Sequence, residues 1–126
     1  MKTNAGLWID HRNAVIVVID EKGEETKRIK FDAEKQVRSS GGAQEDSEED
    51  IRDRRFMNHL NKYYDEVIAC VRNAESILVF GPGEAKAEIK KRLENEKIKT
   101  HVVDIETVDK MTDNQIAAKV REYFRQ

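Results

Sequence analysis

Cysteine and long apolar runs are nearly absent from this sequence. Cys70 is the only cysteine, so no internal disulfide can form, and no Cys or His pairs have the spacing of a zinc site. We therefore expect a protein of a reducing compartment, the cytoplasm. The N-terminal residues lack the apolar segment of a secretory signal, and no apolar run approaches the ~20 residues that a membrane span needs. These absences exclude a disulfide scaffold and a zinc module, and they predict no membrane partner.

A net charge of one sign is also missing. The 126 residues fit one folding unit, and we expect a single domain over 1–126. Lys and Arg number 23 and Asp and Glu number 25, which gives a net charge of -2 at pH 7. The chain as a whole is therefore not attracted to nucleic acid or to an anionic membrane. Any contact with RNA must use a local basic patch.

Hydrophobic periodicity predicts five strands and three helices. We expect strands over 6–12, 14–20, 25–31, 76–80 and 99–106, and helices over 47–73, 84–95 and 112–126. Thr112 and Gln115 have the spacing of a capping box at the start of the last helix. The order β-β-β-α-β-α-β-α places an antiparallel meander before parallel strands with right-handed crossovers. The predicted fold class is therefore α/β, with a mixed sheet of the ribonuclease H-like type that translational machinery components share.

Between the third strand and the first helix lies an acidic, apolar-poor segment, 33–50. Its composition predicts a mobile loop that is either functional or a tether. Gly41 and Gly42 permit backbone conformations that are closed to other residues, and Gln44 carries a donor and an acceptor without charge. These three residues are a candidate tip that enters an RNA-lined cavity. The alternative is a flexible linker.

The first helix combines an apolar stripe with a basic side. The stripe, which we expect to be buried, consists of Phe56, Leu60, Tyr63, Tyr64, Val67, Ile68 and Val71. The other side carries the candidate phosphate contacts Arg52, Arg54, Arg55, His59 and Lys62. The basic side predicts the local patch that RNA binding requires.

Acidic residues at strand ends provide a second candidate site. In a ribonuclease H-like nuclease, clustered carboxylates hold two metal ions that activate water. Asp10, Glu84 and Asp104 are the candidate ligands, although the first helix offers no acid on its inner stripe. The alternative is that these carboxylates are solvated, as most acidic residues are. The histidines at positions 11, 59 and 101 have no paired metal-binding spacing.

The segment 81–86 (GPGEAK) stands between a strand and a helix, where a phosphate-binding loop would lie. It lacks the third glycine of a dinucleotide fingerprint and the GK[ST] ending of a nucleotide triphosphate loop. Glu84 would place a carboxylate at the phosphate position. We therefore predict a tight turn before the helix and no nucleotide cofactor.

Several segments together suggest a family. They are GLWIDHRNAVIVVI, RDRRFMNHLNKYYDEVIACV, ILVFGPGEAKAEIKKRL and VVDIETVDKMTDNQIAAKVREYF. Through them the chain resembles small bacterial translational machinery proteins, and with these the middle domain of archaeal and eukaryotic class I peptide release factors and of Pelota-type ribosome-rescue proteins. The resemblance implies a ribonuclease H-like fold and the ribosome as a partner.

For release factors, the resemblance implies a Gly-Gly-Gln tip that promotes attack of water on peptidyl-tRNA. Gly41, Gly42 and Gln44 stand in the corresponding region, with Ala43 between the second glycine and the glutamine. This insertion shifts the glutamine by one residue step of roughly 3.3–3.6 Å, whereas catalysis needs much finer placement. Gln44 is the one candidate catalytic residue, and we expect it to be inactive.

The leading hypothesis is a non-enzymatic, translation-related protein of the cytoplasm that associates with the ribosome or RNA and needs no cofactor. Two alternatives stay open. One is a metal-dependent nuclease that uses Asp10, Glu84 and Asp104. The other is a homodimeric interaction module that uses a strand edge or a helix face.

Overall fold

The structure is a computed structural model that describes residues 3–31, 48–96 and 100–125. Its centre is a five-stranded sheet with the strand order β3-β2-β1-β4-β5. The strands are β1 (Asn4–Ile9), β2 (Asn13–Asp20), β3 (Gly23–Lys30), β4 (Ser76–Gly81) and β5 (His101–Thr107). β2 is antiparallel to both β1 and β3, whereas β4 is parallel to both β1 and β5. The predicted α/β class, mixed sheet and element order are confirmed.

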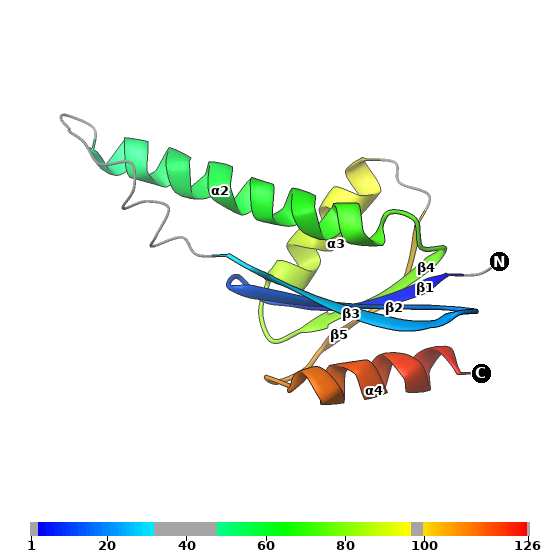
Figure 1. The fold of residues 1–126 in the computed structure, drawn as a ribbon. Helices are drawn as coiled ribbons and strands as arrows, with labels where there is room; N and C mark the ends of the chain where they lie inside the picture. Colours follow the sequence, from blue (N-terminus) through cyan, green and yellow to red (C-terminus); the bar gives the residue numbers. More distant parts are fainter. Residues whose placement is uncertain (1–2, 32–47, 97–99, 126) are drawn as a thin grey trace.

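Three helices cover the two faces of this sheet. They are α2 (Glu48–Val71), α3 (Ala85–Asn95) and α4 (Asp113–Phe124). Helices α2 and α3 lie on one face and α4 lies on the other, which makes three layers (Figure 1). The predicted capping box is present at the start of α4, where the Thr112 side chain accepts from the Gln115 amide and the Gln115 side chain accepts from the Thr112 amide. Within the described ranges, no helix is both long and apolar enough to cross a membrane.

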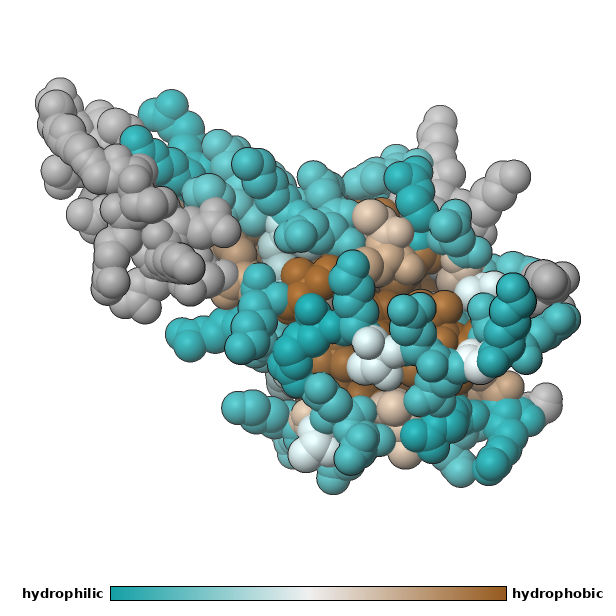
Figure 2. Space-filling view, viewed as in Figure 1, coloured by the Kyte–Doolittle hydropathy of each residue, from teal (hydrophilic) through white to brown (hydrophobic). Residues whose placement is uncertain are grey.

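Side chains of β1 and β2 alternate between two hydrophobic cores. Leu7 and Ile16 are buried under α2 and α3, and Trp8 and Val15 are buried under α4. A Cβ atom on Gly6 would lie 2.0 Å from the Val120 side chain, so glycine allows α4 to approach the sheet closely. On the face seen in Figure 2, apolar side chains are visible near the middle and hydrophilic side chains surround them.

Helix α2 is longer than the sheet beneath it, so the sheet does not bury the whole of the predicted apolar stripe. Six of the predicted stripe positions are buried: Leu60, Tyr63, Tyr64, Val67, Ile68 and Val71. Phe56 is 39% exposed, so the prediction of its burial is wrong. The reason is that the N-terminal half of α2 extends past the end of the strands, where no sheet covers its stripe (Figure 1).

Some predicted boundaries also differ from the structure. The predicted loop 33–50 is wrong at its end, because α2 begins at Glu48 and includes positions 48–50; carboxylates in a first helical turn are favoured by the helix dipole. Residues 33–47, with the predicted tip at Gly41, Gly42 and Gln44, lie outside the described residues. Strand β1 ends at Ile9, earlier than predicted, because a turn follows it.

Candidate functional site

Several elements meet where the parallel strands β1 and β4 end. The β1–β2 turn (10–12), the segment after β4 (82–84) and the N-terminal half of α2 lie at this edge of the sheet (Figure 1). In open α/β sheets, ligands bind outside the carboxyl ends of the strands. This edge of the sheet is therefore the candidate functional site.

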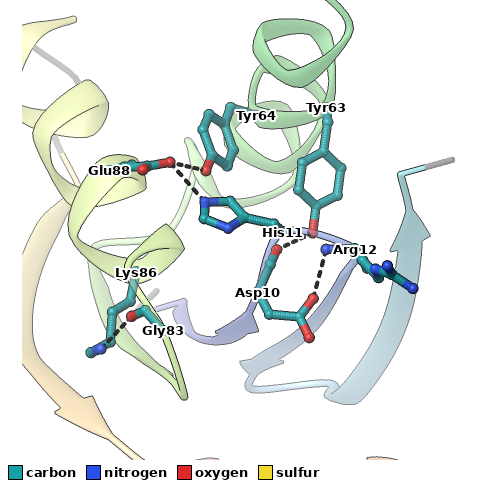
Figure 3. A network of polar contacts seen from close by, with 8 residues as sticks. All are labelled: Asp10, His11, Arg12, Tyr63, Tyr64, Gly83, Lys86 and Glu88. Carbon is teal, nitrogen blue, oxygen red and sulfur yellow. Dashed lines mark hydrogen bonds and ion pairs between the residues drawn. The ribbon is translucent and has the colours of Figure 1, made fainter. Parts of the chain in front are cut away.

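Asp10 organises the β1–β2 turn. Its Oδ1 atom accepts hydrogen bonds from the amides of Arg12 and Asn13, at 2.8 and 2.6 Å. Its backbone carbonyl accepts from the Tyr63 hydroxyl of α2 at 2.9 Å (Figure 3). Burial raises the pKa of Tyr63, and the nearby Asp10 carboxylate raises it further, so the phenol remains a donor. Asp10 therefore shapes the turn and positions α2 above it.

Glu88 of α3 joins three elements. Its Oε1 atom accepts from the Tyr64 hydroxyl and lies 3.2 Å from Nε2 of His11 (Figure 3). Burial raises the pKa of Tyr64, and the hydrogen bond to Glu88 adds to this effect. The contact links α2, α3 and the β1–β2 turn through one carboxylate oxygen.

Arg92 of α3 provides a second link between α3 and α2. Its guanidinium forms an ion pair with Asp65 of α2, donates to the Asn61 carbonyl at 3.2 Å, and lies 6.0 Å from the centre of the Tyr64 ring. Burial alone would lower the pKa of Arg92, but its hydrogen bonds to Asp65 and Glu96 outweigh that effect and raise it. Helix α2 is thus held by α3 as well as by the sheet.

A row of four aromatic rings extends from this junction to the projecting half of α2. Tyr64 and Tyr63 have ring centres 5.5 Å apart, and Tyr63 stacks on Phe31 at 5.4 Å. Phe31, which directly follows β3, contacts Phe56 edge to face at 5.6 Å and 74°. Aromatic pairs at these distances stabilise a structure beyond the area that they bury. The row fixes the direction in which α2 leaves the sheet.

The predicted phosphate contacts fall into three groups. Arg54, Arg55 and Lys62 are exposed on α2, as the prediction requires. Arg52 lies in α2, and its side chain is outside the described part of the molecule. His59 is half-buried, with an Nδ1 atom that is buried and has no hydrogen-bond partner among the described residues. His59 is therefore not on the open basic side, because it lies between the two faces of the helix.

Sequence reasoning missed two residues at this edge. Arg12 is exposed on the β1–β2 turn, and its carbonyl accepts from the Phe31 amide at 2.8 Å. Phe31 itself is buried against α2. A local pattern does not reveal either role, because the sheet register brings the end of β3 beside the turn.

The candidate metal ligands are not brought together. Within the described ranges, no group of three or more His, Cys, Asp or Glu residues could hold a metal ion. Asp10 instead binds turn amides, and Asp104 accepts from the Ile105 amide at 2.8 Å. Glu84 is exposed at the start of α3, where its side chain makes no capping hydrogen bond. No observation in this part of the chain favours the nuclease alternative.

The segment 81–86 runs from the last residue of β4 through a bend at 82–84 into α3. The ammonium of Lys86, in the first turn of α3, donates to the carbonyl of Gly83 in this bend (Figure 3). The lysine that a phosphate-binding loop would direct at its ligand therefore binds the bend itself.

Solved structures share this fold. The Pelota protein of Thermoplasma acidophilum is 15% identical, with a TM-score of 0.59 over 96% of this chain and 32% of its own. Pelota of Archaeoglobus fulgidus is 18% identical, with a TM-score of 0.55 over 97% of this chain and 31% of its own. The archaeal translation termination factor aRF1 is 14% identical, with a TM-score of 0.54 over 98% of this chain and 40% of its own.

The chain has the fold of one part of Pelota and aRF1. The resemblance to a release-factor and Pelota domain that the sequence suggested is thereby confirmed for the fold. The chain spans between about a third and two fifths of the length of these proteins. No protein-family model matches the sequence, and no curated protein sequence matches it.

Proposed function

We propose that the chain is a translation-related, non-enzymatic protein of the cytoplasm that associates with the ribosome or its RNA through the N-terminal half of α2. The observation that carries this proposal is the pair of exposed arginines, Arg54 and Arg55, on a projecting half-helix within a fold shared with a translation termination factor. The fold match extends over almost the whole chain, so it includes the elements that position this helix.

The charge on α2 supports the assignment of the contact surface. Residues 54–62 include two arginines and one lysine and no carboxylate, whereas 48–53 include four carboxylates and one arginine and 65–71 include two carboxylates. The basic character of α2 is thus confined to its middle, positions 54–62. Lys and Arg side chains on a projecting element bind phosphates by displacing condensed counterions.

The rigidity of the junction supports the same surface. The aromatic row, the Tyr63 hydrogen bond to the β1–β2 turn and the links through Glu88 and Arg92 hold α2 at a fixed angle. A rigid element loses less conformational freedom when it binds. The projecting half therefore presents its cations in a defined arrangement.

Co-sedimentation with ribosomes at low salt tests the proposal. We expect the wild-type chain to pellet with ribosomes and the double variant Arg54→Ala, Arg55→Ala to pellet much less. The matched control is Lys90→Ala, Lys91→Ala, which removes two adjacent cations from α3 and should bind like the wild type. No association of the wild-type chain with ribosomes or RNA at low salt would overturn the proposal.

The absence of catalysis is a separate part of the proposal. Ala43 interrupts the Gly-Gly-Gln pattern, so we expect the wild-type chain to release no peptide from peptidyl-tRNA above the background rate. Release that disappears in Gln44→Ala would contradict this and would make the predicted tip catalytic.

A further inference from the structure

Strand β3 ends the sheet on one side and leaves its outer edge open. It is the terminal strand in the order β3-β2-β1-β4-β5, and all of its residues except Ile29 are exposed. The amide of Phe31, which directly follows β3, donates to the carbonyl of Arg12 at 2.8 Å. Backbone groups of an antiparallel strand point to alternate sides, so alternate residues from Glu24 to Lys30 direct theirs away from β2. No strand of the described sheet pairs with these outward-facing groups.

The charges along β3 change sign at its middle. Glu24 and Glu25 precede Thr26, and Lys27 and Arg28 follow it. In the reverse direction the same five residues place a cation wherever the forward direction has a carboxylate. A two-fold symmetric contact pairs a strand with its own reversed copy. An antiparallel second copy centred on Thr26 therefore meets every carboxylate of this segment with a cation.

The backbone permits this alignment, and the charges select it. With Thr26 opposite Thr26, the outward-facing Glu24 lies opposite the outward-facing Arg28, as an antiparallel ladder requires. Glu25 then lies opposite Lys27 on the other face of the sheet. A shift of the second copy by two residues would place Lys27 opposite Lys27 or Glu25 opposite Glu25. Like charges that face each other directly destabilise a sheet, so the two shifted alignments are disfavoured.

The two faces of β3 differ in how their charges are already used. On the α4 face, Glu24 and Arg28 form ion pairs with α4. On the other face, Glu25 and Lys27 are exposed, and no ion pair among the described residues uses them. These two side chains can pair with a second chain without giving up an ion pair of their own. Charged side chains normally keep an edge strand from pairing, but here their order removes the obstacle for a strand of the same sequence.

We propose that the chain forms a two-fold symmetric homodimer in which the β3 strands of two copies pair antiparallel, with Thr26 on the two-fold axis. The sheets of the two copies then form one continuous sheet across the interface. A strand with another order of charges would bring like charges together, so this edge selects a second copy of the chain. The inference goes beyond the proposed function and is independent of it, because the proposed RNA contacts lie on α2.

Sedimentation velocity at low salt measures the oligomeric state over a series of protein concentrations from micromolar to millimolar. We expect the wild-type chain, with a mass of 14.6 kDa, to reach twice that mass within the series. Lys27→Glu would place two carboxylates opposite each other, and Glu25→Lys would place two cations opposite each other. Each variant alone should therefore remain a monomer at concentrations where the wild type is a dimer.

A mixture of the two variants tests the alignment itself. In a mixed pair, position 25 of each chain faces position 27 of the other with the opposite charge. An equimolar mixture of Glu25→Lys and Lys27→Glu should therefore form a dimer although neither variant does so alone, and this recovery would also show that both variants fold. The matched control is Lys91→Glu, which reverses one charge at an exposed position of α3 and should form a dimer like the wild type.

Three results would overturn the inference. The first is a wild-type chain that remains a monomer throughout the series. The second is a dimer that persists undiminished in both single variants, because another surface would then hold it together. The third is a mixture of the two variants that remains monomeric, because positions 25 and 27 would then not face each other. Co-sedimentation with ribosomes tests the proposed function separately, so either idea can fail without the other.

Discussion

The exposed cations of α2 and of the β1–β2 turn determine how steeply RNA binding should depend on salt. Arg54, Arg55 and Lys62 are exposed on α2, and Arg12 is exposed on the adjoining turn. Each cation that neutralises a phosphate of single-stranded RNA adds about −0.7 to the slope of log K against log salt concentration. If all four side chains make such contacts, the slope is about −2.8, and affinity falls about fiftyfold between about 50 mM and about 200 mM salt.

The variant Arg54→Ala, Arg55→Ala removes two of these contacts. Its slope should be about −1.4, so the same increase in salt should weaken binding only about sevenfold. Fluorescence anisotropy of labelled oligouridine over a salt series measures both slopes. The Lys90→Ala, Lys91→Ala control should keep the wild-type slope. If the arginine variant also kept it, those side chains would contact no phosphate and the reasoning would be refuted.

Three further predictions concern the contacts that hold this edge of the sheet together. A Cβ atom on Gly81 would lie 2.2 Å from the Ile9 carbonyl oxygen, so Gly81→Ala should lower the free energy of unfolding by about 3 kcal/mol; an unchanged urea midpoint would contradict the close approach. Tyr63→Phe removes the donor to the Asp10 carbonyl and should cost about 1 kcal/mol in the same assay, and a variant as stable as the wild type would show that this hydrogen bond contributes nothing. Because folding raises the pKa of Tyr63 and Tyr64 above the ordinary 10.0, their stabilising contribution is complete below pH 10 and is lost as the pH rises above it. Urea unfolding on both sides of pH 10 should show that the free energy of unfolding declines, and the decline should be smaller in the double variant Tyr63→Phe, Tyr64→Phe. A decline of equal size in this variant would show that other titrating groups cause it.

Periodicity predicted which side of α2 faces the sheet, but not where the sheet ends. The 24 residues of α2 span about 36 Å, whereas the eight residues of β2 span about 27 Å. A helix that packs along such strands must extend past them by about 10 Å. This excess corresponds to about six residues at the start of α2. Phe56 lies on the predicted stripe just after them and is only partly covered, with 39% of its surface exposed. The comparison of lengths was available from the sequence and predicts that α2 projects past the sheet, but it does not predict the exposure of Phe56.

Asp10 shows why strand-end carboxylates are ambiguous in a sequence. A carboxylate in this position can bind a metal ion or accept hydrogen bonds from the amides two and three residues later, and the residue type is the same in both cases. The structure shows the second use, with Arg12 and Asn13 as donors. The hydrogen bond from Tyr63 and the contact of Phe31 with Phe56 join distant parts of the chain, and only the register of the sheet brings these partners together.

The edges of the sheet bear on the homodimer alternative. Side chains of β3 are engaged with α4 through the ion pairs Arg28–Asp113 and Glu24–Arg121. The pairing register between β4 and β5 shifts between Ile77 and Leu78. The Asp104 carboxylate of β5 accepts a hydrogen bond from the Ile105 amide. Charged side chains and irregular register are the devices that prevent edge strands from pairing with another chain. These features disfavour a homodimer built on the β5 edge and the pairing of β3 with an unrelated strand, which leaves a helix face or β3 of a second copy as the surface that a homodimer would use. The β3 edge is favoured, because antiparallel pairing about Thr26 places opposite charges face to face.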